Sequence, residues 1–190
     1  MKNAGARYIL KALAQEGIRY AFLVPGYNID PFVESHPESG VDIIVAAHEG
    51  GAAFMADGYA RASKRFGVCM GLGGPGLTNM VTAIAAAYAD RSPVLVLSGA
   101  LPSAWTGDGT FQDSSATGID DIDVMRPVTT WAHRVPEVYK TKEEKDISRE
   151  FEPDYEKVKD FLQKAMRKMC GVESRPEYLS LSRSMLSARL

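Results

Sequence analysis

Apolar and polar positions change along the chain with two different periods. Short apolar runs that are typical of buried strands lie at residues 20–24, 42–48, 66–70, 93–99, 129–135 and 177–182. Segments with apolar residues at helical spacing separate most of these runs, at 1–18, 50–63, 77–90 and 154–171. This alternation predicts a doubly wound α/β fold, with a parallel sheet of about six strands and helices on both of its faces.

Length and composition fit one folded domain. The chain has 190 residues, of which 45% are hydrophobic, so we expect a single domain with a sizeable core over residues 1–190. Only the stretch 136–153 departs from the alternation of strands and helices. It carries many charges between two prolines, and we expect it to form an excursion on the surface.

Charge and cysteine content narrow the range of partners. With 22 basic and 24 acidic residues the net charge is -2, which argues against nucleic acid and anionic membranes as partners. No apolar run is long enough to span a membrane, and residues 1–18 have the pattern of an ordinary helix rather than a signal peptide. Cys69 and Cys170 form no disulfide or zinc pattern, so we expect a cytoplasmic protein.

A glycine-rich turn follows the third apolar run. Gly71, Gly73 and Gly76 have the spacing G-x-G-x-x-G, but this strand does not open the alternation and no acid ends the next strand, so dinucleotide binding is not indicated. The turn also lacks the lysine of a phosphate-binding loop. It is therefore a tight junction between a strand and a helix.

The junction after the second strand carries His48 and Glu49. A carboxylate in the first turn of a helix is stabilised by the helix dipole, so Glu49 has a structural interpretation as well as a functional one. A histidine at a strand end is also commonly structural. The following helix, 50–63, is rich in glycine and alanine, which fits close packing either on the sheet or on a second subunit.

The order of these motifs resembles a known family. The stretch "AAHEGGAAFMADGYARAS" followed by "GLGGPGLTNMVTAIAAAYADRSPVLVLSG" resembles the pyrimidine-binding domain of thiamine diphosphate enzymes, in the group of acetolactate synthases and 2-oxo acid decarboxylases. The later stretches "GDGTFQDSS", "DVMRPVTTWAHRV" and "SRPEYLSLSRSM" are similar to segments of the same domain. The resemblance therefore covers nearly the whole chain.

The resemblance implies a role for each of these positions. Glu49 would hydrogen-bond N1′ of the cofactor's aminopyrimidine and promote removal of the proton from thiazolium C2, which makes it catalytic. Gln112 would be the second catalytic residue and would face the substrate with Phe111 and His48. The residues implied at the cofactor, besides Glu49, are Pro25, Gly26, Gly74, Pro75, Gly76 and Asn79, the last also being a candidate for a subunit interface.

Only half of such a site is present in the sequence. The family binds Mg²⁺ and the diphosphate through Gly-Asp-Gly and a later asparagine, but no asparagine follows Gly107, Asp108 and Gly109. We therefore expect no metal ligands in this chain. It would be the pyrimidine-binding subunit of a split decarboxylase or acetolactate synthase-like lyase that acts on a small 2-oxo acid. It would form a homodimer, or a heterotetramer with a diphosphate-binding partner. A catalytically silent scaffold and an N-terminal domain of a longer enzyme are the alternatives.

Overall fold

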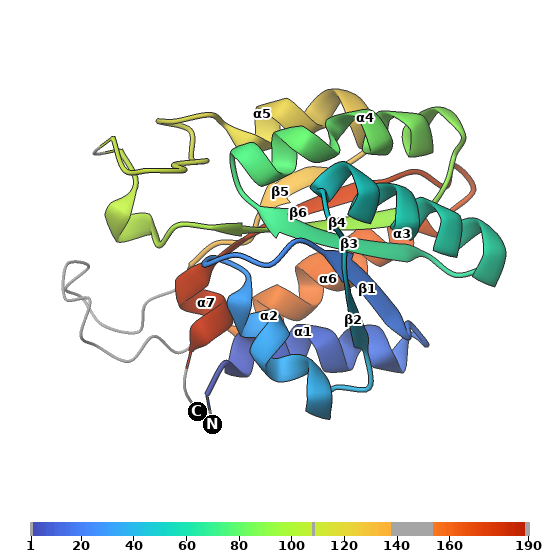
Figure 1. The fold of residues 1–190 in the computed structure, drawn as a ribbon, viewed down its shortest axis with the longest axis horizontal. Coiled ribbons are helices and arrows are strands. Elements are labelled where there is room, and N and C mark those ends of the chain that lie inside the picture. Colours follow the sequence, from blue (N-terminus) through green and yellow to red (C-terminus); the bar gives the residue numbers. More distant parts are fainter. Residues whose placement is uncertain (1, 108, 138–153, 189–190) are drawn as a thin grey trace.

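The sheet has six parallel strands, which confirms the prediction. The computed structural model describes residues 2–107, 109–137 and 154–188. Its strands lie in the order β2-β1-β3-β4-β6-β5, and every neighbouring pair is parallel (Figure 1). Their bounds are β1 (Tyr20–Leu23), β2 (Asp42–Val45), β3 (Gly67–Leu72), β4 (Val94–Ala100), β5 (Ala132–Arg134) and β6 (Glu177–Ser182).

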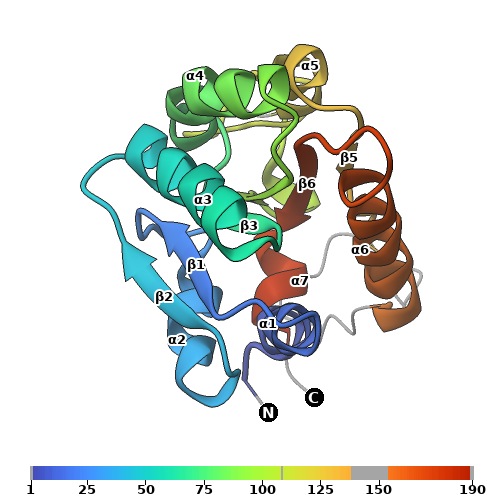
Figure 2. The same ribbon diagram turned by 90° about the vertical axis from the view of Figure 1, so that its right-hand side faces the viewer.

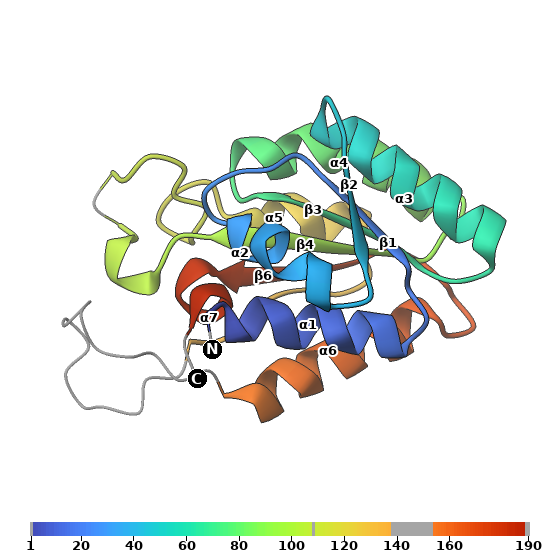
Figure 3. The ribbon, with the colours of Figure 1, turned by 60° about the horizontal axis from the view of Figure 1, so that its bottom comes forward.

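Helices cover both faces of this sheet. One face carries α3 (Glu49–Ser63), α4 (Pro75–Ala89) and α5 (Asp121–Met125), as the upper part of Figure 1 shows. The other face carries α1 (Ala4–Gln15), α2 (Asp30–Ser35), α6 (Tyr155–Met169) and α7 (Arg183–Ser187). On that face α1 and α6 lie side by side (Figure 2; Figure 3), with the rings of Tyr8 and Tyr155 5.1 Å apart. Short 3₁₀ helices lie at His36–Glu38, Ser103–Trp105 and Arg126–Val128.

Alternate residues of the central strands supply two separate cores. In β3, Val68 and Met70 belong to the core that includes α1 and α6, whereas Cys69 belongs to the core that includes α3 and α4. Every residue of β4 and β6 is buried. Strands with both faces covered bury side chains at successive positions, which explains why β4 appears in the sequence as a mainly apolar run. β6 differs, because it also buries the polar residues Glu177, Ser180 and Ser182.

The edge strands are shorter than predicted. β2 ends at Val45 instead of residue 48, because His48 leaves the sheet to begin α3. β5 has three residues, Ala132–Arg134, where seven were expected. The sequence analysis also did not identify α2, α5 and α7, which have five or six residues and are too short to show a helical period.

A buried polar network ties α5 to the sheet. The carboxylate of Asp121 accepts hydrogen bonds of 2.7 Å from the hydroxyls of Tyr178 and Ser180, and Tyr178 also contacts Ser98 Oγ at 2.6 Å. Arg134 on β5 forms an ion pair with the same carboxylate. Since a buried carboxylate is stable only when it is paired, this network fixes α5 over β5 and β6.

Two stretches singled out in the sequence lie partly outside the residues that the structure describes. Most of the charged stretch 136–153 lies outside them, so the surface excursion stays a prediction, and Asp108 also lies outside them. Among the residues that the structure describes, no helix has the length and apolarity needed to cross a membrane.

Candidate functional site

The candidate site lies where the first three strands end. The connection after β1 leads to β2 on one side, whereas the connection after the neighbouring β3 leads to β4 on the opposite side. Ligands of open α/β sheets bind at the carboxyl ends of strands where the strand order reverses in this way. The residues that follow β1, β2 and β3 include Gly26, Glu49 and the turn at Gly74, all of which the sequence analysis singled out.

The turn after β3 is a tight, glycine-rich connection at this edge of the sheet. Gly74 has φ +69° and ψ -114°, a conformation that only glycine adopts readily, and Pro75 then occupies the first position of α4. A side chain on Gly76 would come within 3.2 Å of Leu72 Cβ and 3.6 Å of Glu49 Oε1. The turn therefore packs closely on the end of β3 and faces the carboxyl group of Glu49.

The loop after β1 packs on the same leucine. A Cβ atom on Gly26 would lie 2.8 Å from Leu72 Cδ1, so any larger residue here would displace the leucine side chain, and Pro25 beside it is exposed. Leu72 thus lies between Gly26 and Gly76 and sets their separation. The sequence analysis did not include it, although the last residue of a strand before a glycine turn is a position from which a side chain can contact both loops.

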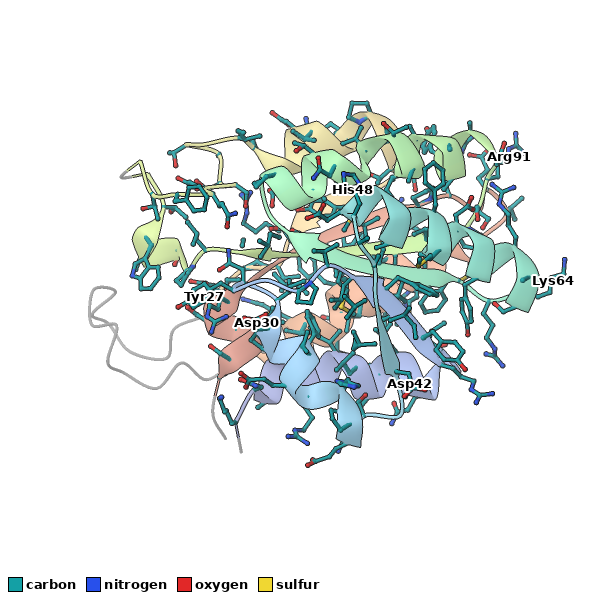
Figure 4. The ribbon with its side chains drawn as sticks, viewed as in Figure 1. Tyr27, Asp30, Asp42, His48, Lys64 and Arg91 are labelled. Atoms are coloured by element: carbon teal, nitrogen blue, oxygen red, sulfur yellow. The ribbon has the colours of Figure 1, made fainter. Side chains whose placement is uncertain are left out.

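His48 is the N-cap residue of α3. Its Nδ1 accepts a hydrogen bond of 3.0 Å from the backbone N–H of Gly50, so the histidine has a structural role (Figure 4). Because Nδ1 is the acceptor, a neutral ring carries its proton on Nε2. His48, and not Glu49, therefore provides the side-chain hydrogen bond that caps α3.

Glu49 is held by Asn79 instead. The Asn79 Nδ2 group on α4 donates a hydrogen bond of 2.9 Å to Glu49 Oε2. The other oxygen, Oε1, lies toward Gly76. The carboxyl group thus lies between the start of α3 and the first two turns of α4. Its Oε2 is bonded to Asn79, and its Oε1 faces the glycine turn.

The loop that carries Phe111 and Gln112 lies beside this turn. A Cβ atom on Gly74 would be 3.9 Å from Gln112 Cα, and Gln112 itself has φ +63°. The side chain of Phe111 is 82% exposed and contributes nothing to the core. The structure therefore brings Gln112 to the glycine turn, whereas Phe111 extends into solvent.

Asp113 organises this loop, which the sequence analysis did not foresee. Its carboxylate accepts hydrogen bonds of 2.9 Å from the backbone N–H groups of Gly107 and Ser115. Burial favours the neutral carboxyl, but these hydrogen bonds outweigh it and lower the pKa of Asp113. An aspartate that follows Gln112 and precedes two serines has the pattern of a turn that the side chain stabilises.

A cavity of about 470 Å³ occupies the other half of the same sheet edge. Its walls include Ala100, Arg134 and Ser182 at the ends of β4, β5 and β6, together with Ser115 and Thr117. Ser114, which precedes these two residues, packs against Gly73. The loop of residues 110–118 therefore borders the cavity on one side and the Gly74 turn on the other.

The small residues of α3 point in two directions. Ala53 and Ala56 are fully buried in the chain's own core against α4 and the sheet, so the close packing inferred from the sequence is in part internal. On the outer side, a Cβ atom on Gly51 or Gly58 would meet no described atom within 4 Å. The side chains exposed on this helix include two large apolar ones, Phe54 at 49% and Met55 at 44%, as well as the charged Arg61 near its end.

The chain is similar in sequence to known proteins over its N-terminal part. Residues 3–120, more than half of the chain, match the family model described as "Thiamine pyrophosphate enzyme, N-terminal TPP binding domain". A probable acetolactate synthase large subunit from Methanocaldococcus jannaschii is 46% identical over 115 residues, which are 60% of this chain and 20% of that protein. The large subunit of acetolactate synthase isozyme 2 from Escherichia coli is 36% identical over 115 residues, which are 60% of this chain and 21% of that protein.

A third relative has a different named activity. It is a probable 2-ketoarginine decarboxylase from Pseudomonas aeruginosa, 45% identical over 101 residues, which are 53% of this chain and 18% of that protein. The chain thus spans about one fifth of the length of the curated relatives that it matches. The chain belongs to the thiamine pyrophosphate enzyme family, through the N-terminal TPP binding domain of that family.

Proposed function

We propose that the chain is the pyrimidine-binding half of a thiamine diphosphate-dependent enzyme that acts on a 2-oxo acid, and that Glu49 activates the cofactor. One observation carries the proposal: the carboxyl group of Glu49 lies at the carboxyl edge of the sheet, bonded to Asn79 through Oε2 while Oε1 faces the glycine turn. The family of the chain supports thiamine diphosphate as the cofactor.

The residues at this edge fit a flat heteroaromatic ring. Gly76 and Gly26 both pack against Leu72, and the exposed Pro25 and Pro75 beside them present apolar rings at this edge. A planar ring needs such apolar surface, and it needs a few fixed polar groups for orientation. Glu49 supplies a polar group of this kind.

In this proposal each residue has a defined task. Thiamine diphosphate supplies the electron sink for breaking the bond between the carboxylate and the carbonyl carbon of a 2-oxo acid. Glu49 exchanges a proton with N1′ of the pyrimidine through Oε1, because a carboxyl group both donates and accepts protons. Pro25, Gly26 and the Gly74 turn hold the ring, while Gln112 faces the substrate.

We further propose that a partner supplies the diphosphate and Mg²⁺ site. The sequence contains no asparagine after Gly109 to complete the Gly-Asp-Gly motif, and the curated relatives are about five times longer than the matched region. A separate subunit or the remainder of a longer chain would complete the site equally well. A silent scaffold remains the alternative function, and it predicts that Glu49 has no chemical role.

The outer face of α3 is our proposed contact with that partner or with a second copy of the chain. Gly51 and Gly58 leave its surface open, and Phe54 and Met55 are exposed apolar side chains on the same helix. Contiguous exposed apolar surface is typical of interaction sites. Both a homodimer and a heterotetramer would bury it.

The proposal is tested by comparing the chain alone with the chain assembled with its diphosphate-binding partner. We expect the chain alone to bind thiamine diphosphate weakly in calorimetry, with or without Mg²⁺, because the charged end of the cofactor stays in water. The assembled protein should release carbon dioxide from at least one 2-oxo acid in a panel of pyruvate, 2-oxobutyrate and 5-guanidino-2-oxopentanoate. Tight, Mg²⁺-dependent binding by the chain alone would refute the half-site, and a cofactor-loaded assembly without decarboxylation of any member would favour the scaffold.

A further inference from the structure

The hydrogen bond between Asn79 and Glu49 connects two helices, α3 and α4, that pack against each other on one face of the sheet. Asn79 lies in the second turn of α4, and Glu49 is the first residue of α3. An ionised carboxylate only accepts hydrogen bonds, so the Nδ2 group of Asn79 must face Oε2. This contact gives the two oxygens of Glu49 different surroundings.

The close approach of the two helices depends on the glycine after Glu49. A Cβ atom on Gly50 would lie 3.0 Å from the backbone oxygen of Asn79, which is at the limit of real contacts. Gly50 therefore lets the second turn of α4 come within hydrogen-bonding reach of Glu49. Because His48 caps α3, the carboxyl group of Glu49 is free to make this contact.

The contact also determines which oxygen of Glu49 faces the glycine turn. A glutamate side chain has three rotatable bonds, and a partly exposed one samples several rotamers unless a partner fixes it. With Oε2 bonded to Asn79, Oε1 is the oxygen that lies toward Gly76. Proton transfer requires a fixed distance and direction, so fixing the carboxyl group increases the fraction of time in a productive geometry.

We propose that Asn79 is a positioning residue: it holds Oε2 of Glu49 and so presents Oε1 to the pyrimidine of the cofactor. This role rests on the proposed function of Glu49. A positioning residue acts only through the carboxyl group of Glu49, whereas a direct role would require Asn79 itself to contact the cofactor.

The contact itself is testable in the chain without cofactor. The carboxamide protons of Asn79, followed by NMR, should change their chemical shifts in Glu49→Ala, because the hydrogen bond to Oε2 is lost. The carboxamide signals of Asn28, which is buried in the loop after β1, are the internal control and should stay in place. Asn79 signals with the same shifts in the wild type and in Glu49→Ala would overturn the proposed contact.

The positioning role is tested by a double-mutant cycle in the assembled, cofactor-loaded protein. We expect Asn79→Ala to slow deuterium exchange at C2 of the cofactor about 10- to 100-fold, the scale reported for misplaced reacting groups. In a Glu49→Gln background the same substitution should change the rate by less than about threefold, since the two side chains act as one unit. Thr82→Ala, on an exposed position of α4, is the matched control and should leave exchange unchanged.

Each outcome of the cycle has a separate meaning. An equal loss from Asn79→Ala in both backgrounds would show a direct or structural role and overturn the proposal. No loss in the wild-type background would overturn it as well, while leaving the role of Glu49 intact. A normal exchange rate in Glu49→Gln alone would instead remove the proposed function on which this inference rests.

Discussion

Glu177 is a buried acid whose ionisation should make the protein less stable as the pH rises. It is the first residue of β6, its exposed fraction is 0%, and Thr130 donates a hydrogen bond to its Oε1. Its Oε2 has no hydrogen-bond partner among the described residues. Burial raises the pKa of this carboxyl group to about 7, because the charged form is poorly solvated, and the hydrogen bond from Thr130 and the charge of Lys168 offset only part of that effect.

The sign and size of the effect follow from the two pKa values. Below the ordinary pKa of 4.5 the carboxyl group is protonated in both the folded and the unfolded chain, so it has no effect on stability. As the pH rises toward the folded value of about 7 the unfolded chain ionises first, and stability falls until it levels off above that value. At about 1.4 kcal/mol per pKa unit the upper limit is between about 3 and 4 kcal/mol, and we expect about 2 kcal/mol because a charged carboxylate draws in water.

Glu177→Gln tests this reasoning, because glutamine keeps the shape and the acceptor for Thr130 but does not ionise. The free energy of unfolding of both proteins would be measured with urea at about pH 5 and about pH 8.5. We expect the stability of the variant relative to the wild type to be about 2 kcal/mol higher at the higher pH than at the lower pH. Glu173→Gln, at an exposed position, is the control and should show no such gain. If wild type and Glu177→Gln differ by the same amount at both pH values, the carboxyl group is not held in its neutral form.

Three further outcomes are expected elsewhere in the chain. Burial raises the pKa of the Cys69 thiol to about 12, so a thiol reagent followed by mass spectrometry should label exposed Cys170 in the native protein and leave Cys69 unmodified until unfolding. Asp121→Ala should cost about 3 to 5 kcal/mol in urea unfolding, because it removes the carboxylate that half-buried Arg134 and the buried hydroxyls of Tyr178 and Ser180 share, and a cost under about 1 kcal/mol would contradict the network. Gly67→Ala should cost about 1 to 3 kcal/mol, because its Cβ atom would lie 2.0 Å from a backbone oxygen of α3. Gly58→Ala, with open space around it, should stabilise the helix by about 1 kcal/mol, and equal effects of the two glycine substitutions would refute the packing argument.

The sheet was predictable from the sequence because its central strands are buried on both faces. Apolar runs marked β3 and β4, whereas β6 was marked by Tyr178, Leu179 and Leu181 among buried polar residues. The strand order was not predictable in the same way. β6 is the last strand of the chain but lies between β4 and β5, and this arrangement depends on contacts between residues far apart in the sequence.

The site was predictable only in part. The rule that ligands bind at strand ends, together with the resemblance to the family, drew attention to Glu49 and the Gly74 turn. The contact between Asn79 and Glu49 spans 30 residues and depends on how closely α3 and α4 approach, which no local pattern specifies. Asp121 is bonded to residues 57 and 59 positions away, so no local pattern indicates this network.

Deuterium exchange at C2 of bound thiamine diphosphate tests the central claim most directly, because it reports cofactor activation without requiring the unknown substrate. The experiment compares wild type, Glu49→Gln and the control Glu173→Gln, each assembled with the diphosphate-binding partner. Loss of the carboxylate in Glu49→Gln should cost the fold only about 0.3 to 1 kcal/mol at the start of α3. We predict that its exchange rate falls about 100- to 10,000-fold, the range of general acid–base catalysis, while Glu173→Gln exchanges like the wild type. A Glu49→Gln protein that assembles, retains the cofactor and exchanges C2 at the wild-type rate would contradict the account.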